Sequence, residues 1–501
     1  MPRICFAVFI VSLLTACRPL THPKGEIIIM QTEAPRTMDP ADHTETYTTA
    51  VLNPIYESLT TFNQQLEIVP LLATGWHSSP DGITWTVNLR PNVRFHDGTA
   101  FNAQSVVASF NRLLDVRRGL AGASNVRRAV DGVEESDPLT VVFHLKAPFA
   151  AFPRVLAITS IVSSAADHDG NLSRHPVGTG PYRFVEWKTG EYVREIRNEE
   201  YWGTKPAPAE LRWMWTSEPA LMNMAILSGE VDAVNPLPPV FADALQHNNK
   251  IKLLKGKSSA VFWVALNSHY KPLSDVRVRR ALNYATDRVN LVRSQLRGYA
   301  QPATSPLAPA TANYSADIKG YPFDIAKAQF LMNEAGYPNG FPMNIAVLEN
   351  QSNYAEALQG MWQRIHVNLT IQKLESGTFA QTIFGSPEQK AATHTDSVIA
   401  SWSSASLDAE RQLGPLYRTR SWSPAGANLG FYTNPHLDSV LDRAAADLDP
   451  ITQQALYNEA QQIIVDDAPH VLLFYAMDLA ALRHDLTDLW LFPGGDVELT
   501  R

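Results

Sequence analysis

The feature that most constrains the fold of this 501-residue chain is a stretch, residues 72–114, in which turn residues separate segments of regular apolar pattern. Residues 79–82, Ser-Pro-Asp-Gly, predict a turn, because proline fixes φ near −65° and glycine tolerates positive φ. Residues 83–89 then alternate apolar and polar side chains. This alternation is typical of a strand that is buried on one face only.

Two further elements are expected in the same stretch. Residues 93–95 predict a second short strand between two turns. From Ala103 onward apolar side chains recur at helical spacing, and Asn102 is available as the N-cap of this helix. Strands followed by an amphipathic helix predict a mixed α/β protein. Elsewhere we expect strands over 26–31 and 471–475, a strand-turn-strand unit over 131–147, and helices over 44–62, 324–331 and 457–465.

The first 17 residues have the form of an export signal. Met1-Pro2-Arg3 is a short basic start, and the apolar segment that follows, residues 4–14, is shorter than the roughly 20 residues that span a bilayer. Leu-Thr-Ala-Cys at 14–17 resembles a lipobox, where a signal is cut and the new N-terminal cysteine is acylated. An ordinary cleaved signal with an incidental cysteine is the alternative. We expect residues 1–17 to be a signal peptide and Cys17 to be lipidated.

The composition excludes several classes of protein. The chain has two cysteines, Cys5 and Cys17, so the body after residue 17 has none for a disulfide, a zinc cluster or a thiol nucleophile. A net charge of −8 and the lack of a basic block argue against a nucleic-acid partner. With 501 residues and 45% hydrophobic content, the chain is long enough for two large domains.

The residue pattern of 72–114 also resembles that of a known protein family. The run W-x-x-S-x-D-G-x-x-W-x-x-x-L-R-x-x-V-x-F-x-D-G-x-x-F-x-A is similar to the signature of the extracytoplasmic solute-binding proteins of peptide, nickel and oligosaccharide ABC importers. Residues 176–182, PVGTGPY, and 198–202, NEEYW, resemble further motifs of that family. The G-x-G in PVGTGPY could suggest a phosphate loop, but Pro181 interrupts the helix start that a phosphate cradle needs. Residues 275–288 look like another family helix, whose four arginines by charge alone predict a solvated face.

The resemblance covers nearly the whole chain after the signal. It implies an α/β, two-lobed periplasmic binding protein fold (type II, cluster C) with an extra subdomain inserted in the first lobe. It also implies that the chain crosses between the lobes near Asn267 and near residues 463–467. The implied boundaries are 18–47, 170–265 and 462–501 for lobe I, 48–169 for the inserted subdomain, and 266–461 for lobe II.

An enzyme is not indicated. We find no G-x-S-x-G, H-E-x-x-H, G-x-x-x-x-G-K-[ST] or C-x-x-C motif, and the fourteen histidines are scattered. We therefore expect no catalytic residue, no metal and no cofactor. A periplasmic peptide hydrolase is the alternative from a different class.

The most informative segment for a ligand is residues 400–410. Trp402 follows an apolar strand and opens a serine-rich loop that ends in Asp408 and Glu410. A ring and a carboxylate together suit an ammonium group, although two solvated acids on a surface loop would look the same. Of these two acids we expect only Asp408 to pair with the ligand. The candidate ligand-binding residues are Trp402, Ser403, Asp408, Glu410, Asn267, Thr46 and Tyr47.

Within the family, the chain most resembles the glutathione-binding branch. There the loop reads W-S-A-S-T-G-E-A-D, followed by P-L-F and F-Y-x-N; here Trp402-Ser403, Asp408-Ala409-Glu410, residues 415–417 and residues 431–434 hold those places. Leu407 replaces the glycine before the first acid, which can alter the backbone φ. The arginine with which many dipeptide binders hold the ligand carboxylate is not found in residues 350–360.

The resemblance implies a monomeric receptor that closes two lobes around a short peptide, glutathione or similar, and delivers it to an ABC permease. It implies a place in the periplasm or cell envelope, with a lipid anchor at Cys17. A nickel, haem or oligosaccharide cargo is the alternative within the family.

Overall fold

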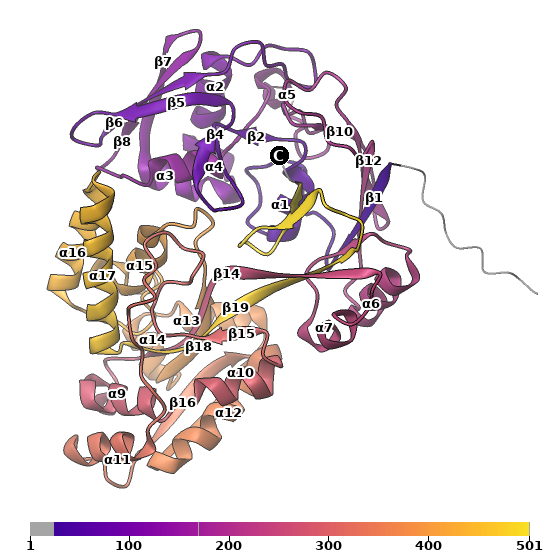
Figure 1. The fold of residues 1–501 in the computed structure, drawn as a ribbon. Helices are drawn as coiled ribbons and strands as arrows, with labels where there is room; N and C mark the ends of the chain where they lie inside the picture. The colour runs from indigo at the N-terminus through magenta and orange to yellow at the C-terminus, as the bar shows by residue number, and fades with distance from the viewer. Residues whose placement is uncertain (1–24, 169, 500–501) are drawn as a thin grey trace, which may run out of the picture.

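The computed structural model describes residues 25–168 and 170–499. The predicted signal peptide, Cys17 and most of the segment after it lie outside the described residues. The chain forms two lobes joined by two long strands, and a further α/β body lies above the second lobe (Figure 1). The predicted two-lobed fold is confirmed.

One eleven-stranded sheet runs through both lobes. In lobe I, β1 alternates its side chains between two cores: Ile27 and Ile29 face one, Ile28 and Met30 the other, which explains its continuous apolar sequence. The sheet order is β10 (Tyr182–Lys188), β11 (Tyr192–Arg197), β12 (Glu210–Trp215), β1 (Glu26–Gln31), β13 (Ala233–Val234), β19 (His470–Arg483), β14 (Ile251–Leu266), β18 (Ser397–Trp402), β16 (Phe341–Leu348) and β17 (Val367–Leu374), with β15 (Ala300–Pro302) beside β19.

Strands β14 and β19 connect the lobes. In lobe I, residues 251–257 of β14 pair with residues 477–483 of β19, and β13 lies on the other side of β19. In lobe II, residues 261–265 of β14 pair with residues 470–475 of β19, and β18 lies on the other side of β14. The register shifts between Lys257 and Val261, so the ladder is interrupted between its lobe I half and its lobe II half. The predicted crossing points lie where β14 ends and where the last helix leads into β19. The predicted domain boundaries stay predictions.

The inserted body has its own four-stranded sheet and its own core. The predicted helix is confirmed as α2, which Asn102 caps by accepting from the Ser105 backbone N–H. The strand expected at residues 93–95 is wrong: the segment folds back on itself, and Phe95 N–H donates to the Thr99 carbonyl. The elements are β5 (Ala73–Ser78), β6 (Thr84–Leu89), β7 (Val130–Asp137), β8 (Thr140–Leu145), α2 (Ala103–Leu114), α3 (Ser124–Ala129), α4 (Phe152–Ala157) and α5 (Ser164–His168).

The helix predicted over 44–62 is wrong in length, because α1 ends at Leu52. The next carbonyls, of Pro54 and Ile55, accept from the backbone N–H groups of Tyr182 and Gly180 instead of continuing the helix. The PVGTGPY motif therefore joins α1 to the sheet. The elements around this junction are α1 (Thr46–Leu52), β2 (Glu57–Ser58), β3 (Thr60–Phe62), β4 (Ile68–Pro70) and β9 (Ser160–Ile161).

Of the four arginines in residues 275–288, Arg277 is exposed as their charge predicts, but the others do not form a solvated face. Arg279 is 8% exposed and donates to the Asp467 carbonyl at 2.7 and 2.9 Å, and Arg280 donates to the Asp466 carbonyl. These carbonyls end α17 and have no partner inside the helix. The helices of lobe II are α8 (Lys271–Ser274), α9 (Val276–Tyr284), α10 (Arg288–Leu296), α11 (Ile325–Glu334), α12 (Ser352–Trp362), α13 (Ser376–Ile383), α14 (Pro387–Ala392), α15 (Ala409–Tyr417), α16 (Pro435–Ala446) and α17 (Pro450–Asp467).

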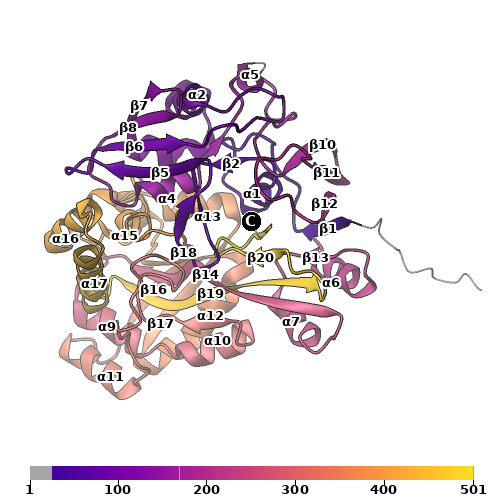
Figure 2. The ribbon, with the colours of Figure 1, turned by 45° about the horizontal axis from the view of Figure 1, so that its top comes forward.

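Lobe I is completed by α6 (Pro219–Ser228), α7 (Pro239–Leu245) and the C-terminal hairpin β20 (Leu489–Leu491) and β21 (Val497–Leu499). The inserted body lies against α16 and α17 of lobe II (Figures 1 and 2), where the Ala150 N–H donates to the Ala445 carbonyl at 3.1 Å. It therefore contacts both lobes.

Candidate ligand-binding site

Trp402 ends β18 opposite Val261, next to the interruption in β14. Its indole N–H donates to the Arg411 carbonyl at 3.0 Å, and its own carbonyl accepts from the Gln412 side chain. Both bonds tie the end of the strand to the first turns of α15. The strand that we predicted before Trp402 is confirmed. The extended loop is shorter than predicted, because α15 begins at Ala409 and places Glu410 in its first turn.

Asp408 caps α15. Its Oδ1 accepts from the Arg411 backbone N–H at 2.8 Å, and its Oδ2 accepts from the Ser406 hydroxyl. A carboxylate at this position compensates unpaired N–H groups and the positive end of the helix dipole. Asp408 is 2% exposed, so the alternative of a solvated surface acid is wrong for this residue. Its pairing with a ligand stays a prediction.

Glu410 makes a two-pronged ion pair with Arg418, with N···O distances of 2.8 and 3.1 Å. Burial raises the pKa of Glu410, and the adjacent Arg418 guanidinium acts in the opposite direction. Arg418 also contacts Asp442. The Arg418–Asp442 contact links the end of α15 to α16. The Glu410–Arg418 pair occupies the carboxylate that sequence reasoning offered as a second ligand contact.

Two arginines join this segment to the inserted body. Arg154 of α4 donates to the Leu407 carbonyl at 3.3 Å, and Arg411 of α15 donates to the Asn125 carbonyl at 3.2 Å. Burial lowers the pKa of both guanidinium groups, and the Asp408 carboxylate acts in the opposite direction. Sequence reasoning missed both, because Arg154 lies 253 residues from its partner and no local pattern marks it.

Leu407 keeps a left-handed turn where the branch motif has glycine. Its φ is +50°, a conformation that costs a leucine roughly 1–2 kcal/mol. The side chain is fully buried, and that burial offsets the strain. The carbonyl accepts from Ala312 as well as from Arg154. Leu407 therefore adopts a positive φ, a conformation that glycine favours.

A cavity of about 200 Å³ lies beside Trp402 in lobe II. Its walls come from β14, β18, α13, α15 and the segments around residues 348–351 and 427–429. The lining residues are Trp263, Leu348, Gln351, Phe379, Ile383, Phe384, Ala400, Ser401, Trp402, Leu416, Ala427 and Leu429.

The remaining candidates are not all near this cavity. Ser403 is exposed on the loop directly after Trp402. Asn267 lies at the far end of the β14–β18 pair, where its backbone N–H donates to the Asp396 carbonyl and its side chain caps a turn. Thr46 and Tyr47 begin α1 of lobe I. The structure therefore brings together Trp402, Ser403, Asp408 and Glu410, and it separates Asn267 from them.

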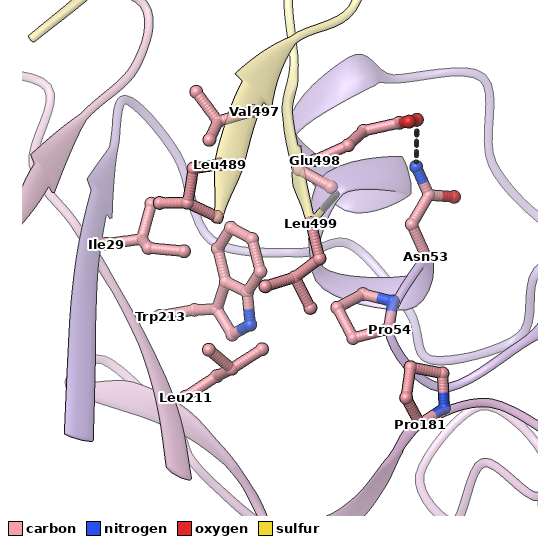
Figure 3. Close-up of a pocket in the computed structure, with 11 residues that line it drawn as sticks. Ile29, Asn53, Pro54, Pro181, Leu211, Trp213, Leu489, Val497, Glu498 and Leu499 are labelled. Carbon is pink, nitrogen blue, oxygen red and sulfur yellow. Dashed lines mark hydrogen bonds between the residues drawn. The ribbon is translucent and has the colours of Figure 1, made fainter. Parts of the chain in front are cut away.

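Lobe I has a cavity of its own beneath the C-terminal hairpin (Figure 3). Trp213 and Leu211 face Leu489 and Leu499 across it, and Asn53 donates to Glu498 at 2.9 Å. Its volume is about 20 Å³, room for about one water molecule. A peptide would not fit there.

Within residues 25–168 and 170–499, no group of three or more His, Cys, Asp or Glu side chains is placed to hold a metal ion. No helix in this part of the chain is both long and apolar enough to cross a bilayer.

Two lobes joined by β14 and β19, with an inserted body over the Trp402 segment, form the two-lobed fold of the periplasmic binding proteins. The sequence model of the bacterial extracellular solute-binding proteins, family 5, matches residues 67–424. The chain belongs to this family.

Similar proteins agree with this assignment. The glutathione-binding protein GsiB of Pectobacterium atrosepticum is 33% identical over 465 residues, which cover 91% of this chain and 90% of the relative. HbpA2 from Haemophilus parasuis has a similar structure, with a TM-score of 0.85, 26% identity, and coverage of 95% and 99%. A dipeptide-binding protein from Pseudoalteromonas sp. SM9913, solved with Met-Leu, gives a TM-score of 0.77 at 25% identity, with coverage of 95% and 99%.

Proposed function

We propose that this protein captures short peptides for an ABC importer and does not hydrolyse them. One observation carries the proposal: the Trp402 segment of lobe II is in contact with the inserted body through Arg154 and Arg411. The lobe II cavity adjoins this contact through Trp402, which lines it and whose indole N–H donates to the Arg411 carbonyl. A buried carboxylate and two guanidinium groups there complement a ligand that carries an ammonium and a carboxylate.

Closure would couple binding to transport. The interrupted ladder between Lys257 and Val261 is the place where β14 and β19 can bend. A peptide that contacts both sides stabilises the closed arrangement by its differential affinity for it. The transmembrane subunits of the importer would then receive the closed, loaded form.

Glutathione or a related peptide is the cargo that we favour. The relative with 33% identity is named as a glutathione-binding protein, and at the glycine position of that branch Leu407 has a positive φ, which glycine adopts readily. The Arg154 and Arg411 guanidinium groups supply positive charge for a peptide with two carboxylates. The Met-Leu complex of the Pseudoalteromonas protein supports the wider class of short peptides.

Asp408→Asn tests the charge contact. Asparagine caps helices as well as aspartate does, so this variant should keep α15 folded while losing the negative charge. Losing one partner of a buried charge pair costs about 2–5 kcal/mol, so a peptide with a free amino group should bind at least tenfold more weakly. Calorimetric titration measures this.

The same titration has a built-in control. An N-acetylated form of the peptide offers no ammonium, and its affinity should be almost unchanged by Asp408→Asn. Equal losses for both peptides would mean that the loop is damaged. If neither peptide lost affinity, Asp408 would act on α15 alone, through the hydrogen bond to Arg411.

We also propose that Cys17 anchors the protein in the cell envelope through lipid. A Cys17→Ser variant should leave the membrane fraction, because the body would then have no acyl chains; stable anchoring takes more than one chain. Fractionation after a high-salt wash measures this. A serine variant that still sediments with membranes would contradict the anchor.

A further inference from the structure

The cavity beside Trp402 has an apolar lining. Only Gln351 and Ser401 of its lining residues are polar, and none is ionisable. Phe379, Leu416 and Ala427 are buried members of the lobe II core around it. Transfer of an apolar group from water into such a cavity is favourable. Transfer of a charged group is unfavourable, because no polar partner there replaces its hydration.

Its size suits one side chain. An apolar cavity of about 150 Å³ can hold a benzene molecule, and this cavity measures about 200 Å³. A phenyl ring or a leucine or methionine side chain would fill it. A glycine or alanine residue at this position of the ligand would leave most of the cavity empty, so the wall atoms would lose van der Waals contacts.

The cavity opens to the surface next to Trp402, which belongs to the proposed peptide site. Phe384 on its wall is 39% exposed and Ser401 is exposed, so it opens to the surface. Trp402 forms part of the wall, and its indole N–H is bonded to the backbone of Arg411. Arg411 in turn reaches the inserted body. One wall of the cavity is thus continuous with the segment that meets both sides of the site.

We propose that this cavity is a specificity pocket that selects peptides carrying a bulky apolar group. The group is an aromatic or long aliphatic side chain, or an alkyl or benzyl substituent on the sulfur of a glutathione-like peptide. The inference rests on the proposed function, because the peptide main chain must lie at the Trp402–Arg411 segment. A glutathione-like ligand that carries such a substituent would use both parts of the site.

Two matched ligand pairs test the pocket by calorimetric titration of the full-length protein. The pairs are Ala-Ala-Ala with Ala-Phe-Ala, and glutathione with S-benzylglutathione. We expect the member with the ring to bind about tenfold to a hundredfold more tightly in at least one pair, since differences of this order arise in hydrophobic pockets. Equal affinities within each pair would overturn the pocket and leave the proposed function standing. No binding by any of the four would overturn both.

Variants of the cavity wall test whether the preference for the ring-bearing ligand arises in this cavity. Ala427→Leu would add a side chain into the cavity, and it should bring the affinity for the ring-bearing ligand down to that of its partner. Ala400→Leu fills the cavity from β18 and gives the same test if the first variant does not fold. Ala220→Leu makes the same change on exposed α6 of lobe I and should preserve the preference. A preference that survives both cavity variants would contradict the assignment.

Discussion

Replacing Arg418 with methionine is expected to lower the free energy of unfolding by about 3–5 kcal/mol, the cost of removing one member of a buried ion pair. The Arg418 side chain is 3% exposed and lies between Glu410 and Asp442. Without it, Glu410 would keep a largely buried negative charge that has lost its ion-pair partner, and its pKa, already raised by burial, would rise further. Urea unfolding followed by circular dichroism measures the loss.

Arg420 is the matched control for this prediction. It contacts the same Asp442 at 3.4 Å, but its side chain is 70% exposed. An exposed ion pair contributes about 0–1 kcal/mol, so Arg420→Met should change stability little. Equal effects of the two methionine variants would contradict the role given to the Glu410–Arg418 pair. Adding Glu410→Met to Arg418→Met should recover most of the loss, because no buried charge is then left unpaired.

Gly178→Ala is expected to destabilise the protein by about 3 kcal/mol, the upper part of the usual range for overpacking. A Cβ atom at Gly178 would lie 2.1 Å from the Ile55 carbonyl oxygen. That backbone cannot easily retreat, because the same oxygen accepts from the Gly180 N–H and the Gly178 carbonyl accepts from His96. The junction between α1, β2 and the PVGTGPY motif would have to open. The urea midpoint and the yield of folded protein measure this.

Gly132 on β7 provides the comparison, since a Cβ atom there would meet nothing within 4 Å. Gly132→Ala should be neutral or slightly stabilising, because alanine restricts the unfolded chain more than glycine does. If Gly178→Ala were as well tolerated as Gly132→Ala, the close approach would not be what requires the glycine.

Elements with strong local signals could be predicted from the sequence. Residues 26–31 form β1 as predicted, and Asn102 caps α2 because both its side chain and its distance from the apolar run specify a helix start. The prediction of one helix over 44–62 was wrong because the apolar pattern continues past Leu52. The carbonyls of Pro54 and Ile55 instead accept hydrogen bonds from a segment over 120 residues later. Competition of this kind has no local signature.

The site was predictable only in part for the same reason. Trp402 and Asp408 could be offered as ligand contacts because they lie within one short segment, and their ligand roles stay predictions. Glu410 was offered as a further ligand contact because sequence shows the acid but not its ion pair with Arg418, the residue that follows α15. Its role toward a ligand stays a prediction. The contacts of Arg154 and the cavity walls depend on how distant segments pack, and no spacing in the sequence encodes them.

Native mass spectrometry of the purified protein with glutathione and a set of di- and tripeptides tests the central claim most directly. We predict one peptide bound per chain, released with unchanged mass when the complex is dissociated. The claim would be contradicted if no peptide remained bound under conditions in which a metal chelate or an oligosaccharide did, or if the peptides were recovered as cleavage products.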